Sequence, residues 1–190
     1  MSLKIDSALK GAWDDVRNDK KNLNWVVGVV KKGKNFQLKA SGTDGIKGFA
    51  TQFDDAEVNF GALKGVGVDG GSKRTRFVLI RWIGSRVKTM QKARVSSYAG
   101  QVNSFFNGTH IAIDAFDVDD IDVKEFEKKL NNSTGAHQPK YYVWDGSKIS
   151  SDDEEEEEEV EEKKDEVEEK KVEVEEITEK VESIIMANDD

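Results

Sequence analysis

The stretch FVLIRWIG, residues 77–84, decides the fold of this chain. Its side chains are apolar except for Arg81 and the closing glycine, and they do not alternate with polar ones. A continuous apolar run of this length is typical of a strand that is buried on both faces. We therefore expect these residues to form a central strand in a sheet.

Positive charge flanks this strand at both ends. Residues 73–94 contain eight lysines and arginines and no aspartate or glutamate. Single cations commonly coat a solvated surface, but a run of this density favours a surface that attracts acidic partners and loses affinity in salt. The eight cations are Lys73, Arg74, Arg76, Arg81, Arg86, Lys88, Lys92 and Arg94. We expect those before and after the strand to form one binding surface on adjacent elements, without a catalytic group.

The spacing of apolar residues predicts the elements around the central stretch. Helices are expected at residues 3–19, 44–53, 87–107 and 118–130, where apolar side chains recur every three or four positions. Strands are expected at residues 24–30, 36–40, 58–66, 77–83 and 111–116. The predicted inner face of the long helix consists of Met90, Ala93, Tyr98, Val102, Phe105 and Phe106. This order of elements places helices on a mixed sheet, which is an α+β fold.

The net charge of −9 averages two parts of opposite sign. Residues 151–190 carry 21 acidic and 5 basic side chains, a net charge of −16. Residues 1–150 carry 24 basic and 17 acidic side chains, a net charge of +7. We therefore divide the chain into a folded domain at residues 1–146 and an acidic tail at residues 147–190. Partners of the folded domain are expected to be acidic, although the whole chain is acidic too.

Three glycines, Gly65, Gly67 and Gly70, match the G-x-G-x-x-G spacing of dinucleotide sites. Such a site also needs a helix directly after the glycines, because the helix N-terminus binds the pyrophosphate. Here a strand is expected instead. We interpret the glycines as a hairpin turn, where glycine adopts positive φ, and expect no nucleotide cofactor.

Composition excludes several other kinds of chemistry. The sequence has no cysteine, so it cannot form disulfides, thiolate nucleophiles or cysteine zinc sites. The aspartates at 114–122 do not fit a calcium loop, because Asp122 stands where glycine is needed and Lys128 where glutamate is needed. We expect them to cap the last helix. No apolar run is long enough to span a membrane. The sequence predicts a cytoplasmic protein that is not an enzyme and uses no cofactor or metal.

Several motifs resemble one family. They are SKRTRFVLIRWIG at residues 72–84, VKTMQKARVSSYAGQVNSFF at 87–106, DDVRNDKKNLNWVV at 14–27 and SGTDGIKGFATQFDDAEVNFG at 41–61. Together with the final helix they cover about residues 4–138 in a consistent order. On these motifs the chain resembles the coactosins of the actin-depolymerising factor homology (ADF-H) superfamily. The resemblance implies a central mixed β-sheet of five or six strands with helices on both faces, followed here by a charged helical or disordered tail.

The resemblance also implies a function. Coactosins bind actin, filamentous in preference to monomeric, and are associated with interference with filament capping and little severing. The basic hairpin and the long helix carry this binding, with a weaker contribution from the last helix. Carried over by position, the actin-binding residues are Lys73, Arg74 and Arg76 on the hairpin, Lys88, Met90, Gln91, Lys92 and Arg94 at the start of the long helix, and Lys124, Lys128 and Lys129 on the last helix.

This chain departs from the family pattern at three places. Arg76 stands where the family commonly has lysine, which keeps the charge and changes the geometry. Residues 140–146, with Tyr141, Tyr142 and Trp144, have no recognisable counterpart and are expected to add an edge strand or to cover apolar surface. The acidic tail is the third departure.

The acidic tail has two parts. Residues 152–159 are eight consecutive carboxylates, which repel one another and should stay solvated. Beyond them valines recur every seven residues, at Val160, Val167, Val174 and Val181. Because Lys163 and Lys170 interrupt the apolar seam, a single charged helix is the first interpretation and a helical dimer the second. We also expect the tail to compete in cis with actin for the basic surface.

Two alternative functions stay open. A dimer formed through the tail would crosslink actin filaments into bundles. A basic domain with an acidic tail is also typical of modules that bind nucleic acid or chromatin proteins. No exposed aromatic stacking pattern accompanies the cations, so nucleic acid is not the expected partner.

Overall fold

The computed structural model describes residues 2–134 and 138–146. The chain divides into two units, Met1–Ser147 and Lys148–Asp190, and all described residues belong to the first. The predicted acidic tail, with its heptad valines, lies outside the described residues. None of the described helices is both long enough and apolar enough to cross a membrane.

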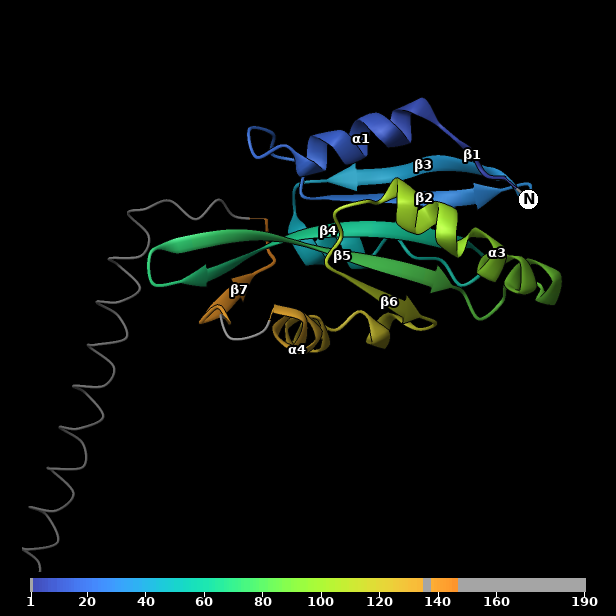
Figure 1. The fold of residues 1–190 in the computed structure, drawn as a ribbon. Helices are drawn as coiled ribbons and strands as arrows, with labels where there is room; N and C mark the ends of the chain where they lie inside the picture. The colour runs from blue at the N-terminus through green and yellow to red at the C-terminus, as the bar shows by residue number, and fades with distance from the viewer. Residues whose placement is uncertain (1, 135–137, 147–190) are drawn as a thin grey trace, which may run out of the picture. The chain divides into compact units, whose positions relative to one another are not determined.

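The described unit is built on one mixed sheet (Figure 1). Its strand order is β1-β3-β2-β4-β5-β6, and β7 pairs with β4. Neighbouring strands are antiparallel except β1 with β3 and β5 with β6. The strands are β1 (Lys4–Ile5), β2 (Trp25–Lys31), β3 (Asn35–Gly42), β4 (Val58–Asp69), β5 (Ser72–Ile83), β6 (Ile111–Ala115) and β7 (Tyr141–Val143). The five long strands were predicted, and β7 confirms the edge strand expected within residues 140–146. The short β1 was not predicted, and it brings the sheet to seven strands.

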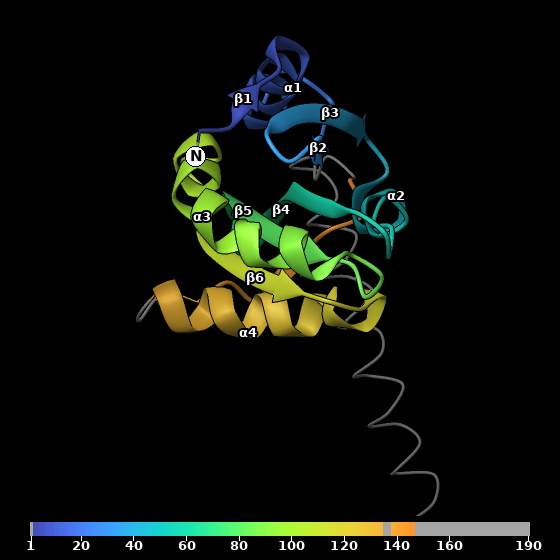
Figure 2. The same ribbon diagram turned by 90° about the vertical axis from the view of Figure 1, so that its right-hand side faces the viewer.

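Helices cover both faces of the sheet, as Figure 2 shows with the strands seen nearly end-on. Helices α1 (Ser7–Arg17) and α3 (Thr89–Phe105) pack on one face, and α2 (Gly45–Ala50) and α4 (Val123–Thr134) on the other. Strand β5 contributes to both cores, because Leu79 packs with α1 and α3 while Ile80 and Trp82 pack with α2 and α4. This confirms that the opening stretch is a central strand buried on both faces.

The buried face of α3 differs from the predicted one. Met90 and Ala93 are exposed, and Val95, Tyr98 and Val102 are buried. Residues four and seven positions apart lie on the same side of a helix, so Tyr98 shares its side with positions 94 and 91. Met90 therefore does not lie on the buried side. The helix also begins later than predicted, since the residue before it has extended backbone. Met90 is therefore available at the surface.

The last predicted helix is two helices. A short 3₁₀ helix, η1 (Val118–Asp120), precedes α4, and each begins at its own aspartate. The Asp117 side chain accepts from the Asp119 backbone N–H, and the Asp122 side chain accepts from the Lys124 backbone N–H. Hydrogen bonds from the Phe116 and Asp117 backbone also hold the pKa of Asp120 below its usual value. The prediction that these aspartates cap a helix is confirmed for Asp117 and Asp122, with two caps in place of one. Asp114 instead lies in β6 and pairs with Arg81 at 2.8 Å.

The β4–β5 hairpin is longer than predicted, and its turn is shorter. Only Gly70 and Gly71 form the turn, with φ of 48° and 81°. Gly65 and Gly67 lie within β4, so placing them in the turn was wrong. A Cβ on Gly65 would come within 2.4 Å of the Trp144 ring, and one on Gly67 within 3.1 Å of Pro139. These two glycines therefore make room for side chains of residues 139–144, which run alongside β4.

Candidate functional site

The predicted cations lie at two opposite ends of β5. Lys73, Arg74 and Arg76 lie near the hairpin tip, and the start of α3 follows the other end of the strand. Nine strand residues at about 3.4 Å each separate Arg74 from Ile83 by about 30 Å. Figure 1 shows the hairpin tip at the left of the unit and the start of α3 at the right. The expectation of one continuous surface is therefore wrong, and there are two.

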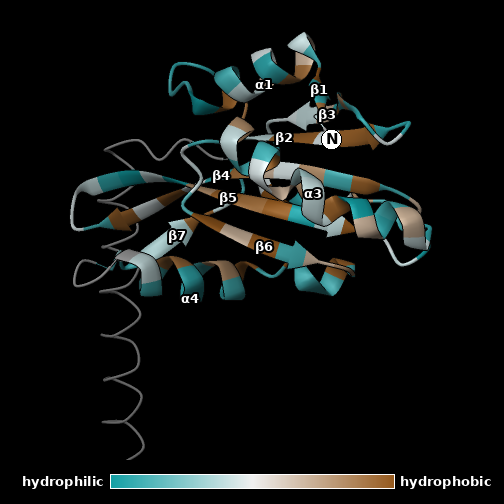
Figure 3. Ribbon diagram, turned by 45° about the vertical axis from the view of Figure 1, so that its right-hand side comes forward, coloured by the Kyte–Doolittle hydropathy of each residue, from teal (hydrophilic) through white to brown (hydrophobic). Residues whose placement is uncertain are grey.

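The first surface is on the part of the hairpin that extends beyond its neighbours. Strand β2 pairs with β4 only as far as Leu63, and β6 pairs with β5 only from Val78. We call residues 64–76 together with β7 the distal sheet. Its tip is hydrophilic, whereas the middle of the long strands is hydrophobic (Figure 3). The distal sheet therefore presents its cations away from the two cores.

The distal cations face two ways, because successive strand residues point to opposite faces. Lys73 is paired with Val68, which pairs in turn with Tyr141, so these three share one face. Arg74 and Arg76 lie on the other face. Among residues 2–134 and 138–146, no ion pair joins either arginine to a carboxylate. Both guanidinium charges are thus left for a partner.

Arg76 lies where the distal sheet leaves the body of the domain. Its charge acts on His110 and on Tyr142. Burial first, and then the Arg76 charge, lower the pKa of His110, whose Nδ1 accepts from the Phe77 backbone N–H at 3.0 Å. Burial raises the pKa of the Tyr142 hydroxyl, and Arg76 opposes that rise. The Arg76 charge on β5 therefore acts towards both neighbours, on His110 just before β6 and on Tyr142 of β7.

The predicted lysines of α4 are all exposed. The helix is tied to the distal sheet through Glu127, which accepts from Trp144 Nε1 at 3.0 Å. At about 100° per residue, Lys128 lies on the flank next to Glu127 and Lys129 on the far flank. Lys128 also lies 3.6 Å from Glu125, an exposed pair of little strength. Of the α4 lysines, Lys128 is better placed than Lys129 to extend the distal surface.

The second surface is the start of α3. Lys88 caps the helix rather than belonging to it, and the Met90 side chain is 69% exposed. Lys92 Nζ donates to the Ser85 carbonyl at 3.0 Å, and Arg94 donates to Met90 Sδ at 3.6 Å. The remaining predicted residue, Gln91, is exposed. Cations here surround an exposed apolar side chain, which is typical of a protein-binding surface.

Two further apolar side chains lie at this end of the sheet, and the sequence analysis missed them. Phe116 is 56% exposed and Val118 is 51% exposed. Both follow β6, whose last residue pairs with Trp82 near the end of β5. Sequence analysis assigned them to the end of a strand and the start of a helix and named neither as an exposed side chain. An apolar pair within a run of aspartates was the available signal, since capping turns leave such side chains in solvent.

A small pocket lies beside the start of α3. Its volume is about 200 Å³, and its lining comes from α3, the β2–β3 turn and the start of β4. Pockets for small molecules usually span about 300–1,000 Å³, so this one suits a single side chain better than a cofactor. The lining residues that belong to the predicted site are Gln91 and Arg94. No group of three or more histidine, aspartate or glutamate side chains within the described ranges is placed to hold a metal ion.

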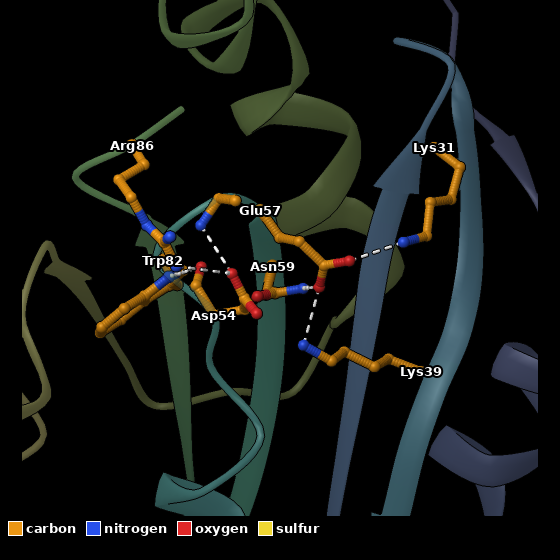
Figure 4. Close-up of polar contacts among 8 residues, drawn as sticks. Lys31, Lys39, Asp54, Glu57, Asn59, Trp82 and Arg86 are labelled. Carbon is orange, nitrogen blue, oxygen red and sulfur yellow. Dashed lines mark hydrogen bonds and ion pairs between the residues drawn. The ribbon is translucent and has the colours of Figure 1, made fainter. Parts of the chain in front are cut away.

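Glu57 fixes the strands around this pocket (Figure 4). Its carboxylate accepts from Lys31 Nζ at 2.6 Å and from Lys39 Nζ at 2.7 Å, which joins the start of β4 to β2 and β3. Burial on its own would raise the pKa of Glu57, but the hydrogen bonds from the two lysines outweigh it and lower the pKa to about 2. Nearby, Trp82 Nε1 donates to the Asp54 carbonyl at 2.8 Å. This end of the sheet is therefore held rigidly.

Comparison with known proteins gives consistent matches. Residues 2–131 match the model of the family described as cofilin/tropomyosin-type actin-binding protein. The chain is 29% identical over 129 residues to coactosin from Dictyostelium discoideum, covering 67% of this chain and 88% of that protein. The crystal structure of coactosin from Entamoeba histolytica has a TM-score of 0.66 at 25% identity, covering 71% of this chain and 99% of that chain. The solution structure of mouse coactosin, an actin filament binding protein, has a TM-score of 0.60 at 26% identity, covering 72% and 95%.

Proposed function

The chain belongs to the family of cofilin/tropomyosin-type actin-binding proteins, and on this premise we propose that it binds the sides of actin filaments through the distal sheet and the start of α3. The family match and the similarity to coactosins agree with the ADF-H resemblance of the sequence. The proposal goes further, because it assigns the binding to named surfaces and prefers the filament to the monomer.

One observation carries this proposal: Arg74, exposed near the hairpin tip, and Arg76, half-buried at the base of the distal sheet, form no ion pair with a carboxylate among the described residues. Cations without an ion pair on their own domain can complement an acidic partner and steer it into place. The distal sheet therefore contributes charge. The start of α3 contributes the apolar contact of Met90.

The separation of the two surfaces supports a preference for filaments. About 30 Å of strand lies between them, so one actin subunit that contacts the start of α3 leaves the distal sheet free to contact a neighbouring subunit. A monomer offers no neighbouring subunit. Two linked contacts bind more tightly than either alone, because the second forms at a high effective concentration. We accordingly propose side binding that interferes with capping and causes little severing.

Cosedimentation tests the proposal. The full chain should pellet with actin filaments and bind monomeric actin more weakly, and added salt should weaken the pelleting because cations carry the contact. Variants that remove only the distal cations should lose filament binding while monomer binding changes little. Equal affinity for monomer and filament, or pelleting that is insensitive to salt, would contradict the two-surface proposal.

The acidic tail enters this proposal through its charge alone. Residues 151–190 carry a net charge of −16 and belong to the same chain as the distal cations. We propose that they compete with actin for these cations and lower filament affinity at low ionic strength, where the Debye length is about 30 Å at 0.01 M.

A further inference from the structure

The distal hairpin has few neighbours in the sheet to hold it in place. The Lys64 backbone N–H still donates to the Asn24 carbonyl at 2.7 Å. Residues 65–76 extend beyond β2 and β6, so neither of these strands pairs with them. A two-stranded hairpin alone is marginally stable in water, and three strands or packing against a helix are needed for an independent fold. Unsupported, the hairpin would move relative to the domain, and Arg74 and Arg76 would move with it. The structure supplies a support from the C-terminal side.

That support begins with β7, which adds a third strand to the hairpin. Val66 pairs with Val143 and Val68 pairs with Tyr141 in antiparallel register. The Lys140 backbone N–H also donates to the Val68 carbonyl at 2.7 Å. β7 thus takes up the edge of β4 that β2 leaves open, and the distal part becomes three-stranded.

Two aromatic rings then fill the space above the glycines of β4. The Trp144 ring lies over Gly65, where even a Cβ would approach it to 2.4 Å. The Tyr142 ring lies over Gly67, at 3.2 Å from a Cβ there. The two rings stack at 5.8 Å between centroids. This is also the face that carries Arg74 and Arg76, because Gly67 pairs with Arg74 and Gly65 with Arg76.

The same two aromatic residues are anchored in the body of the domain. Trp144 is 6% exposed, its Nε1 donates to Glu127 on α4, and its carbonyl accepts from the Ile46 backbone N–H of α2 at 2.8 Å. The Tyr142 hydroxyl donates to Asn131 Oδ1 on α4 at 2.9 Å. One short segment therefore connects the hairpin to two helices of the domain.

We propose that residues 139–144 are positioning residues for actin-filament binding: they hold the distal hairpin at a fixed angle to α4 and so place Arg74 and Arg76. The inference rests on the proposed function for the partner and on the contacts above for the mechanism. The segment lies beyond residues 2–131, which match the family model. The segment keeps the hairpin ordered before binding, so less conformational entropy is lost when the hairpin binds actin.

The test uses the full chain with Tyr142→Ala, which removes the ring over Gly67 and the bond to Asn131. Hydrogen exchange should show amide protection at residues 65–76 falling about tenfold or more, while residues 59–63 and 78–82 keep theirs because β2 and β6 still pair with them. Filament affinity in cosedimentation should fall about tenfold, although every cation is retained. Tyr142→Phe, which keeps the ring, should stay within about threefold of the unchanged chain.

A crosslink supplies the decisive control. The chain has no cysteine, so Val66→Cys with Val143→Cys creates a single disulfide across two residues that are register partners. In the Tyr142→Ala background, the oxidised protein should recover both the protection of residues 65–76 and the filament affinity. The same protein after reduction should stay weak, and it differs by one bond only.

Two results would overturn the proposal. One is unchanged protection of residues 65–76 in Tyr142→Ala, since the segment would then not hold the hairpin. The other is loss of that protection with unchanged filament affinity, since hairpin order would then not matter for binding. If the unchanged chain does not pellet with filaments, the proposed function fails, while the exchange experiment, which needs no actin, still decides whether the segment supports the hairpin.

Discussion

The distal sheet and the start of α3 carry similar runs of cations in the sequence, yet they are built in different ways. The start of α3 lies against the domain beside Glu57, with which Gln91 and Arg94 line one pocket, and the exposed Phe116 and Val118 lie at the same end of the sheet. The distal sheet projects beyond β2 and β6 and depends on β7 for support. One surface is rigid and partly apolar, and the other is charged and supported from a distant part of the chain.

This difference indicates a division of labour. Exposed apolar side chains such as Met90 gain affinity by being buried, which depends weakly on salt. Exposed arginines gain affinity through charge, which salt screens strongly. We therefore expect the two surfaces to respond differently to substitution and to ionic strength.

Removing the distal cations should have the largest effect. Lys73→Ala, Arg74→Ala and Arg76→Ala combined should weaken filament binding about 100-fold, which corresponds to about 2.7 kcal/mol, and should flatten its salt dependence. The change should leave the thermal midpoint nearly unaltered, because these side chains are outside both cores. Cosedimentation over a salt series measures the effect.

A matched control for that variant removes the same charge elsewhere. Lys10, Lys20 and Lys47 are exposed on α1, on the turn after it and on α2. Their combined change to alanine should alter affinity about threefold at most, through net charge alone. A loss equal to that of the distal variant would mean that net charge, and not the distal sheet, determines binding.

The start of α3 should give the next largest effect. Met90→Glu places a charge where an apolar contact is expected and should weaken binding to both filaments and monomers by about 20-fold, with the salt dependence retained. Met90→Leu keeps the apolar surface and should bind within about twofold. If Met90→Glu bound filaments normally, the start of α3 would not be a contact surface.

Local sequence patterns predicted some elements of the fold and not others. The strand at residues 77–83 was predictable because its apolar run is continuous, and the aspartate caps because their chemistry is local. The failure to place Met90 correctly came from a choice between two rows one residue apart on the helix, which tertiary packing decides. β7 has three residues and no periodicity of its own, so the sequence left open whether residues 140–146 would add an edge strand or cover apolar surface. The structure shows both, because β7 pairs with β4 and its rings lie over Gly65 and Gly67.

The arrangement of the candidate site was less predictable than its residues. Lys73 and Lys88 are 15 positions apart in the sequence, which suggested one surface. An extended strand between them turns that short interval into about 30 Å. Conversely, Arg74 and Pro139 line one small hollow although they are far apart in the chain. Closeness in the sequence therefore predicted a single surface for the cations, whereas the topology of the sheet shows that they form two.

The tail should have a smaller, salt-dependent effect. A chain ending at residue 147 should bind filaments about fivefold more tightly than the full chain at 0.01 M salt and equally at 0.15 M, where the Debye length is about 8 Å. The gain should disappear when the three distal cations are alanine, since the tail is proposed to compete for them. Equal affinities of the two lengths across the whole salt series would exclude competition.

Glu57 should affect stability but not binding, which separates the rigid end of the domain from its contact surface. The pKa of Glu57 is lowered from 4.5 to about 2 in the folded chain, so its stabilisation is present above about pH 4.5 and is lost as the pH falls towards 2. Allowing for its partial exposure, Glu57→Gln should lower the free energy of unfolding by about 1 kcal/mol at pH 7.

Urea unfolding at several pH values measures the Glu57 effect. The difference between Glu57→Gln and the unchanged chain should shrink as the pH falls from 4.5 towards 2, and filament affinity at pH 7 should change less than twofold. A difference in stability that does not depend on pH would mean that the carboxylate charge is not what stabilises this end of the sheet.

The most direct test of the two-surface account is a contact map on the filament. Single cysteines can carry a photo-crosslinker at Ser72, the first residue of β5, and at Gln91, in the first turn of α3 beyond the other end of that strand. Both positions are exposed, and the chain has no cysteine of its own. Ser41→Cys on β3 is the control. The account predicts that both positions crosslink to actin in filaments, at different sites on actin, and that only position 91 does so with monomers. Crosslinking from one position alone in filaments, or equal crosslinking from position 41, would contradict it.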